Sequence, residues 1–330
     1  MNRMRKLARW VWKAAPISWR ISPIGRFLHA CFGLYNDISR NDWYALRIRC
    51  APLTQTVRPR LLAAGLPLKR QFLILQGRGG SDAIGLFSEF ATVLGLLEHY
   101  EQWASQYAGL RVDFTQGLYS DARFGANWWD YYFEPIRIGS SDDAVISVIS
   151  PFQGDLFTFR GERLSRNRGF EIIERYIRPK PHISDKVETY VREIFQDAFV
   201  IGIHYRGTDK YQEAPVVPYE RVREAVLEAI RAAMPVRYKL FLATDEQAFL
   251  DYMLAEFPGV LTYRTMFRSI DGNPTHWIDK SNHDKGEDAV IDCILLSRVN
   301  VLIRTASNLS LCSTYINSNV PEIALSREWT

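Results

Sequence analysis

The stretch Ile201-Gly-Ile-His-Tyr-Arg-Gly-Thr-Asp-Lys210 decides the fold class of this 330-residue chain. The apolar run at residues 199–203 predicts a buried strand, and His204, Arg206 and Lys210 follow it directly. In open α/β sheets, ligands bind just beyond the carboxyl ends of the strands. The stretch therefore indicates a strand end that meets a phosphorylated ligand, with an ordinary charged surface turn as the alternative.

Strands and helices alternate through the rest of this half of the chain. Such βαβα alternation predicts a parallel sheet with helices on both faces. The expected strands are 199–203, 239–245, 260–263, 301–303 and 322–325, and the expected helices are 218–233, 247–257, 287–298 and 307–316.

Three of the expected strands end in polar residues, which a nucleotide lying across the sheet edge would meet together. Arg206 or Lys210 could neutralise a diphosphate, and the free amides at the helix start near Ser307 could bind phosphate. Asp245 could accept hydrogen bonds from a base or ribose. The candidates at the three ends are His204, Arg206, Asp209 and Lys210, then Thr244 and Asp245, then Thr305, Ser307 and Asn308.

Asp292 lies within the otherwise apolar helix expected at 287–298. A buried, unpaired carboxylate costs several kcal/mol, so Asp292 requires a partner, either a ligand or Arg206. The alternative is that Asp292 lies on the exposed face, one turn after Asp288.

In the first half of the chain we expect a strand at 72–75, then the loop Gly77-Arg78-Gly79-Gly80, and then a long helix at about 83–107. This order is typical of phosphate-binding βα units, although the loop matches neither a P-loop nor GxGxxG. The glycines could instead allow close packing. Further strands are expected at 110–114 and 144–149.

Residues 119–135 hold seven aromatic side chains in seventeen residues, mixed with polar ones. They fit an aromatic-lined binding wall or a core plug. We expect a loop at 152–168 and a domain junction at Arg178-Pro-Lys-Pro-His182, because proline cannot continue a helix. Ser184 is then expected to cap a helix that reaches Phe195.

The segment before Asp37 carries seven cations and no acidic residue, although the net charge of the chain is only +4. Its apolar residues recur at helical spacing, which indicates a basic amphipathic helix suited to an anionic membrane surface, with a frayed basic terminus as the alternative. Residues 21–35 are too interrupted to span a bilayer, and we expect no signal peptide. Because the basic charge is confined to this arm, we expect no nucleic-acid partner.

The four cysteines form no CxxC pair, which favours a reducing compartment. We therefore expect a cytoplasmic protein with peripheral contact to the inner membrane through the basic arm. The histidines and carboxylates show no spacing typical of metal ligands, so we expect no metal and no cofactor.

In consistent order over about 200–316, these motifs resemble the α-1,6-fucosyltransferase superfamily, which includes the N-glycan core fucosyltransferases and the bacterial NodZ-type enzymes. The motifs are His204-x-Arg206-x-Thr208-Asp209-Lys210, Leu242-Ala-Thr-Asp245, Asp288-x-x-x-Asp292-x-x-x-Leu296-Ser297 and Thr305-Ala-Ser307.

The resemblance implies an α/β, GT-B-like fold: two Rossmann-like domains with a cleft between them. It also implies inverting, metal-independent transfer of a sugar, fucose from GDP-fucose, to a hydroxyl of a glycan or glycolipid. We expect residues 1–36 to form the basic arm, 37–180 an acceptor-side domain and 181–330 the nucleotide-sugar-binding domain.

By the family pattern, Arg206 and Lys210 would hold the diphosphate, with Ser307 nearby. His204, Asp245 and Asp292 would contact the nucleoside. The family's catalytic carboxylate lies just after the lysine, where Glu213 is shifted by one residue, so Glu213 and Asp209 are both candidates for the base. The core fucosyltransferases have a second arginine where this chain has Gly207; Arg78 or Arg304 could compensate.

Two other functions remain open from the sequence. One is a catalytically inactive protein of the same fold that binds a nucleotide sugar or a glycan. The other is a nicotinamide-dependent oxidoreductase that uses the loop at Gly77–Gly80. That loop lacks the third glycine of the GxGxxG pattern, and Asp113 is too far away to hold the ribose.

Overall fold

A computed structural model describes residues 69–77, 84–149, 164–207, 216–266, 268–269 and 281–326. The chain divides into two compact units, Met1–Leu68 and Lys69–Thr330, and the description below concerns the second. The expected basic arm at 1–36 and six predicted site residues lie outside the described residues. These six are Arg78, Gly79, Gly80, Asp209, Lys210 and Glu213.

The first sheet has the order β3-β2-β1-β4. β1 pairs in parallel with both β2 and β4, whereas β3 is antiparallel to β2. The helix α5 (Leu86–Gln102) follows β1 and is almost wholly buried. It ends five residues earlier than expected, because β2 already begins at Tyr107, whose hydroxyl lies 2.7 Å from His99 Nε2 of α5. The strands are β1 (Gln71–Gln76), β2 (Tyr107–Asp113), β3 (Arg137–Gly139) and β4 (Val145–Ile149).

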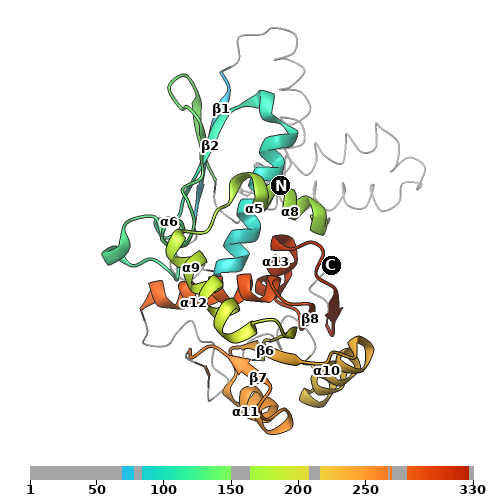
Figure 1. Ribbon diagram of the computed structural model, residues 1–330. Coiled ribbons are helices and arrows are strands. Elements are labelled where there is room, and N and C mark those ends of the chain that lie inside the picture. Colours follow the sequence, from blue (N-terminus) through green and yellow to red (C-terminus); the bar gives the residue numbers. More distant parts are fainter. Residues whose placement is uncertain are drawn as a thin grey trace, which may run out of the picture. The chain divides into compact units, whose positions relative to one another are not determined.

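The second sheet has five strands in the order β7-β6-β5-β8-β9, all parallel (Figure 1). The chain passes from the central β5 to β6 and β7 on one side, and then to β8 and β9 on the other. β5 and β8 therefore flank a topological switch point, where α/β proteins bind ligands. The strands are β5 (Phe199–Tyr205), β6 (Tyr238–Thr244), β7 (Leu261–Tyr263), β8 (Val301–Arg304) and β9 (Glu322–Ala324).

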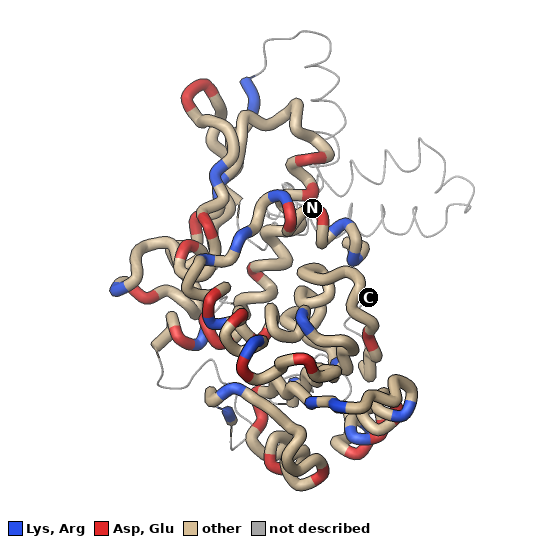
Figure 2. Tube along the Cα trace, viewed as in Figure 1, with Lys and Arg blue, Asp and Glu red and all other residues tan. Residues whose placement is uncertain are grey.

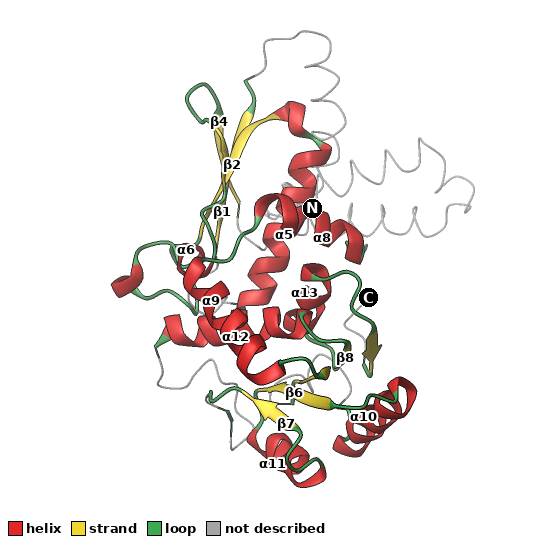
Figure 3. Cartoon of the chain, in the orientation of Figure 1, coloured by secondary structure: helices red, strands yellow, loops and turns green. Residues whose placement is uncertain are grey.

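Helices cover both faces of this sheet (Figure 3). Ile201 and Ile203 pack with α10 and α11, whereas Val200 belongs to the core cluster that contains α12 and α13. The alternation follows the two-residue period of a strand. Gly202 faces α12, since a Cβ there would lie 3.3 Å from the side chain of Leu296 in that helix and 2.9 Å from that of Val299 just after it. The helices are α10 (Tyr219–Ala233), α11 (Gln247–Glu256), α12 (Asn282–Ser297) and α13 (Asn308–Ile316).

The α/β, GT-B-like class expected from the sequence is confirmed in these two largely parallel sheets. One core cluster runs from the first sheet through α5, α8 (Arg166–Tyr176) and α9 (Pro181–Tyr190) to α12 and α13. The expected boundaries at residues 36 and 180 stay predictions.

Two helix starts differ from the expectation. α9 begins at Pro181 rather than after Ser184, because proline fits the first helical turn, where its missing N–H costs nothing. It ends at Tyr190 and passes into a π-helical turn, Val191–Phe195. α12 begins at Asn282, five residues earlier than expected, behind a Ser281 side chain that accepts a bond from Asp284 N.

Charged residues of both signs are interspersed over the described part of the chain, as on α10 (Figure 2). None of the helices in this part has the length and apolar character needed to cross a membrane.

Candidate nucleotide-sugar site

The loops after β5, β6 and β8 are joined by hydrogen bonds at one edge of the second sheet. The amide of Arg206 donates to Thr305 Oγ1 (3.1 Å), and the amide of Thr305 donates to the His204 carbonyl (3.0 Å). The amide of Gly207 donates to Asp245 Oδ1 (3.3 Å). Four of the predicted site residues, with Gly207, therefore meet at the switch point between β5 and β8.

The side chains of Arg206 and Asp245 form the charged centre of this edge. Arg206 Nε lies 3.7 Å from Asp245 Oδ2, and both side chains are largely buried. Thr244 stabilises the turn that contains Asp245, because its Oγ1 accepts a hydrogen bond from the amide of Glu246 (3.2 Å).

Glu246 occupies the space beside Gly207, the position where the resemblance to the core fucosyltransferases would imply an arginine. A Cβ on Gly207 would lie only 1.8 Å from Glu246 Oε2. Glu246 Oε1 accepts a hydrogen bond from the hydroxyl of Tyr219 (2.5 Å), which holds the carboxylate in place. Burial raises the pKa of Tyr219, and Glu246 raises it further. A side chain at position 207 therefore requires Glu246 to move.

Arg304, the second residue that could compensate for Gly207, is bonded at the end of β8. Its Nε donates to Glu322 Oε2 of β9 (2.7 Å), and the residue is only 5% exposed. The guanidinium thus ties β8 to β9.

The N-termini of α13 and α5 meet next to this edge. Ser307 caps α13, since its hydroxyl accepts a bond from the amide of Leu309 (3.3 Å). Asn308 Nδ2 donates to Ser88 Oγ in the first turn of α5 (2.9 Å). Because each helix carries partial positive charge at its N-terminus, the pair favours an anion at this place. Ser307 and Asn308 both lie at this place, as predicted. The Ser307 hydroxyl and Asn308 Nδ2 form their hydrogen bonds with other residues of the protein.

Tyr119, in the segment that follows β2, lies close enough to Arg206 for the charge of Arg206 to act on its hydroxyl. Its buried hydroxyl accepts a bond from the amide of Leu86 at the start of α5 (3.1 Å). Burial raises the pKa of this hydroxyl, and the charge of nearby Arg206 acts in the opposite direction. Gly77 lies beside the same helix, where a Cβ would be 2.9 Å from the Gln116 carbonyl and 3.5 Å from Glu89 Oε1. At Gly77, close packing accounts for the glycine.

Tyr119 and Glu89 were not among the predicted site residues. Glu89 is 1% exposed in an apolar helix, which is the same signal that singled out Asp292.

Asp292 pairs with Arg264, which follows β7, and not with Arg206. Arg264 Nη1 lies 3.2 Å from Asp292 Oδ1, and Arg264 Nη2 lies 3.0 Å from Asp288 Oδ1. Burial raises the pKa of Asp292 to about 6, while Arg264 opposes that rise. Both carboxylates are buried, so the alternative of an exposed face is wrong. The contact joins α12 to the segment after β7.

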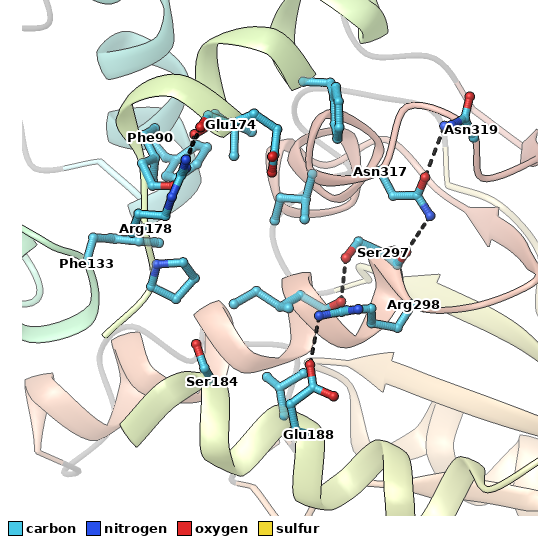
Figure 4. A pocket seen from close by; sticks show the side chains of 17 residues that line it. Phe90, Phe133, Glu174, Arg178, Ser184, Glu188, Ser297, Arg298, Asn317 and Asn319 are labelled. Carbon is cyan, nitrogen blue, oxygen red and sulfur yellow. Dashed lines mark hydrogen bonds and ion pairs between the residues drawn. The ribbon is translucent and has the colours of Figure 1, made fainter. Parts of the chain in front are cut away.

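A cavity of 470 Å³ lies at the other end of the second sheet (Figure 4). Its wall includes Ser297 and Arg298 at the C-terminal end of α12, just before β8 begins, together with Phe90 and Phe133. Arg298 pairs with Glu188 across it (2.8 Å). It contains none of the predicted site residues.

Within the described residues, no three His, Cys, Asp or Glu side chains group in a way that could hold a metal ion. Metal-independence stays a prediction.

Residues 164–325, which include the whole strand edge, match the family model of nodulation protein Z (NodZ). The C-terminal half of the chain is NodZ-like. The resemblance drawn from the motifs is thereby confirmed. NodZ of Bradyrhizobium diazoefficiens is 30% identical over 140 residues, which cover 40% of this chain and 38% of that protein. NodZ of Sinorhizobium fredii is 26% identical over 155 residues, 44% of this chain and 48% of that protein. The matched region thus spans less than half the length of these NodZ relatives.

Solved structures similar to this chain include a NodZ alpha-1,6-fucosyltransferase soaked with GDP-fucose. The match has a TM-score of 0.49 and 18% sequence identity, and it covers 75% of this chain and 93% of that chain. Fucosyltransferase NodZ from Bradyrhizobium has a TM-score of 0.47 and 21% identity, over 78% of this chain and 96% of that one.

Proposed function

We propose that the chain is an inverting, metal-independent glycosyltransferase that moves fucose from GDP-fucose to a hydroxyl of a glycan or glycolipid. The observation that carries the proposal is the meeting of Arg206, Asp245 and Thr305 at the switch point, beside the N-termini of α5 and α13. The motif residues at this edge lie within the NodZ-like region, and one NodZ relative is described with GDP-fucose.

In the proposed reaction, the acceptor oxygen forms a bond to the anomeric carbon while the bond from that carbon to the diphosphate breaks. The diphosphate leaves with the electron pair. Arg206, Lys210 and the helix amides near Ser307 stabilise the negative charge that develops on it, and such electrostatic stabilisation supplies much of the rate enhancement in many enzymes. Asp209 or Glu213 takes the proton of the acceptor hydroxyl.

The nucleoside end of the donor is assigned to His204 and Asp245. Asp292 is assigned an indirect role, because its carboxylate is already paired with Arg264. We also propose a cytoplasmic protein that contacts the inner membrane through the basic arm at 1–36.

The position of Glu246 beside Gly207 favours a second candidate function, that of an inactive protein that binds the nucleotide sugar without turnover. Glu246 adds a negative charge where the core fucosyltransferases have an arginine, and this weakens the hold on a leaving diphosphate.

Two measurements separate the candidates. GDP, UDP, ADP and CMP are compared by the shift of the unfolding temperature, since only nucleotides that bind the folded state raise it. We expect GDP to give the largest rise. Labelled GDP-fucose is then incubated with a panel of glycan and glycolipid acceptors. Transfer supports the enzyme, GDP binding with no transfer to any acceptor supports the inactive protein, and no GDP binding contradicts both.

A further inference from the structure

Six of the seven aromatic side chains in residues 119–135 are buried, and Phe124 is the exception with 50% exposure. The stretch is therefore mainly a core plug. The buried members are Tyr119, Trp128, Trp129, Tyr131, Tyr132 and Phe133. A single exposed ring in an otherwise buried aromatic group requires its own explanation.

The ring of Phe124 lies flat on the imidazole of His283. The ring centroids are 3.7 Å apart and the planes differ by 13°. His283 is the second residue of α12 and is 9% exposed, and its carbonyl accepts a bond from the Tyr132 hydroxyl (2.8 Å). His283 thus covers one face of the phenyl ring, and half of the surface of Phe124 stays exposed.

The loop that carries Phe124 is held by hydrogen bonds at several points. The Tyr131 hydroxyl lies within hydrogen-bond distance of the carbonyls of Asp121 (2.8 Å) and Gly125 (2.6 Å), to which it donates its one hydrogen, and it accepts a bond from the amide of Asp121 (3.3 Å). Gly125 has a φ of 119°, which a residue with a side chain rarely adopts. The ring is thus presented by a preorganised loop, which lowers the entropy cost of binding.

Polar groups border the exposed ring. Arg123 Nε donates to Asp121 Oδ1 (2.9 Å) and Arg123 Nη2 to Asp121 Oδ2 (2.6 Å). These bonds to Arg123 hold the pKa of Asp121 well below its usual range. The side chain of Arg123 is 70% exposed, and its guanidinium carbon lies 5.8 Å from the centroid of the Phe124 ring. The side chain of Asp121 is only 11% exposed, so Arg123 supplies the exposed donor group beside the ring and Asp121 fixes its position.

This combination matches the chemistry of a pyranose ring. A sugar presents C–H groups on one face, which pack on an aromatic plane, and hydroxyl groups around its edge, which require directed donors and acceptors. The same segment between β2 and α6 (Trp129–Tyr132) includes Tyr119, whose hydroxyl accepts a bond from the amide of Leu86 at the start of α5 (3.1 Å). Phe124 lies only five positions after Tyr119, so the aromatic platform belongs to the same loop that borders the candidate site.

We propose that Phe124, with Asp121 and Arg123 at its rim, is a carbohydrate-binding subsite that holds a pyranose ring of the acceptor. The role as an acceptor subsite rests on the proposed transferase function, whereas sugar binding at Phe124 does not.

The test uses the intact chain and three trisaccharides as probes: cellotriose, maltotriose and chitotriose. Binding is followed by saturation-transfer NMR and calorimetry for the wild type and for Phe124→Ala, Phe124→Leu and Phe124→Trp. We expect at least one probe to bind the wild type. Leucine keeps an apolar side chain without a flat face, so Phe124→Leu and Phe124→Ala should bind at least about tenfold more weakly, whereas Phe124→Trp keeps the binding.

Two results would overturn the subsite: no probe binds the wild type, or Phe124→Leu binds as tightly as the wild type. Unfolding temperatures show which variants are folded, and Phe124→Leu and Phe124→Trp keep the comparison valid if the alanine variant is not. The rise in unfolding temperature with GDP is measured in the same samples and should be unchanged by the substitutions. If GDP gives no rise but sugar binding depends on Phe124, the proposed function fails and the sugar subsite stands.

Discussion

The buried pair of Asp292 and Arg264 predicts a pH dependence of stability that one substitution removes. The pKa of Asp292 is about 6 in the folded protein against an ordinary value of 3.8, because burial disfavours the carboxylate. The folded state therefore prefers the protonated acid. Its contribution to stability is fully present below pH 3.8 and is lost as the pH rises through 6.

The loss amounts to about 3 kcal/mol, since each pKa unit corresponds to about 1.4 kcal/mol. Asp292→Asn removes the titrating group and keeps an oxygen that can accept from Arg264. Arg264 also keeps its contact with Asp288 (3.0 Å), so the guanidinium is not left alone. We expect the free energy of unfolding of the wild type to fall by up to about 3 kcal/mol more than that of Asp292→Asn between pH 4 and pH 7.

Urea unfolding followed by tryptophan fluorescence at pH 4, 5, 6 and 7 measures the difference. Asp197→Asn is the matched control, because Asp197 is exposed and pairs with the exposed Arg237. The reasoning is refuted if the profiles of the wild type and Asp292→Asn stay parallel over this range, or if Asp197→Asn changes the profile as much.

Two further predictions concern Gly207 and the basic arm. Gly207→Ala should lower the free energy of unfolding by about 1–3 kcal/mol, because the new Cβ displaces Glu246 from Tyr219. The loss should be smaller when Glu246 is already replaced by alanine. Equal losses in both backgrounds would contradict the contact between position 207 and Glu246. The intact chain should sediment with phosphatidylglycerol vesicles and not with phosphatidylcholine vesicles, since the residues before Asp37 carry seven cations and no acidic residue. Equal sedimentation with both kinds of vesicle, or with neither, would contradict membrane binding by the basic arm.

Three strands of the second sheet, β5, β6 and β8, were predictable because each is a short apolar run that ends in polar residues. Parallel pairing then placed His204, Asp245 and Thr305 at one edge without any further information. The hydrogen bonds that join Arg206 to Thr305 and Gly207 to Asp245 agree with that inference.

The partners of buried groups were not predictable. Asp292 was expected to have a ligand or Arg206 as its partner. Arg264 lies 28 residues away in an irregular segment, and only the packing of α12 against that segment selects it. The stack of Phe124 on His283 likewise joins positions far apart in the sequence. Within residues 119–135 nothing in the aromatic pattern distinguishes the one exposed ring from the six buried ones.

The central claim is that Arg206 anchors a nucleotide sugar, and calorimetric titration with GDP-fucose tests it most directly. The wild type is compared with Arg206→Ala and with Arg221→Ala, which removes an exposed arginine of α10 that pairs with Glu224. We predict that the wild type and Arg221→Ala bind GDP-fucose equally, and that Arg206→Ala, with an unchanged unfolding temperature in the absence of ligand, binds at least about tenfold more weakly. Equal binding by a folded Arg206→Ala, or no binding by the wild type, would contradict the claim.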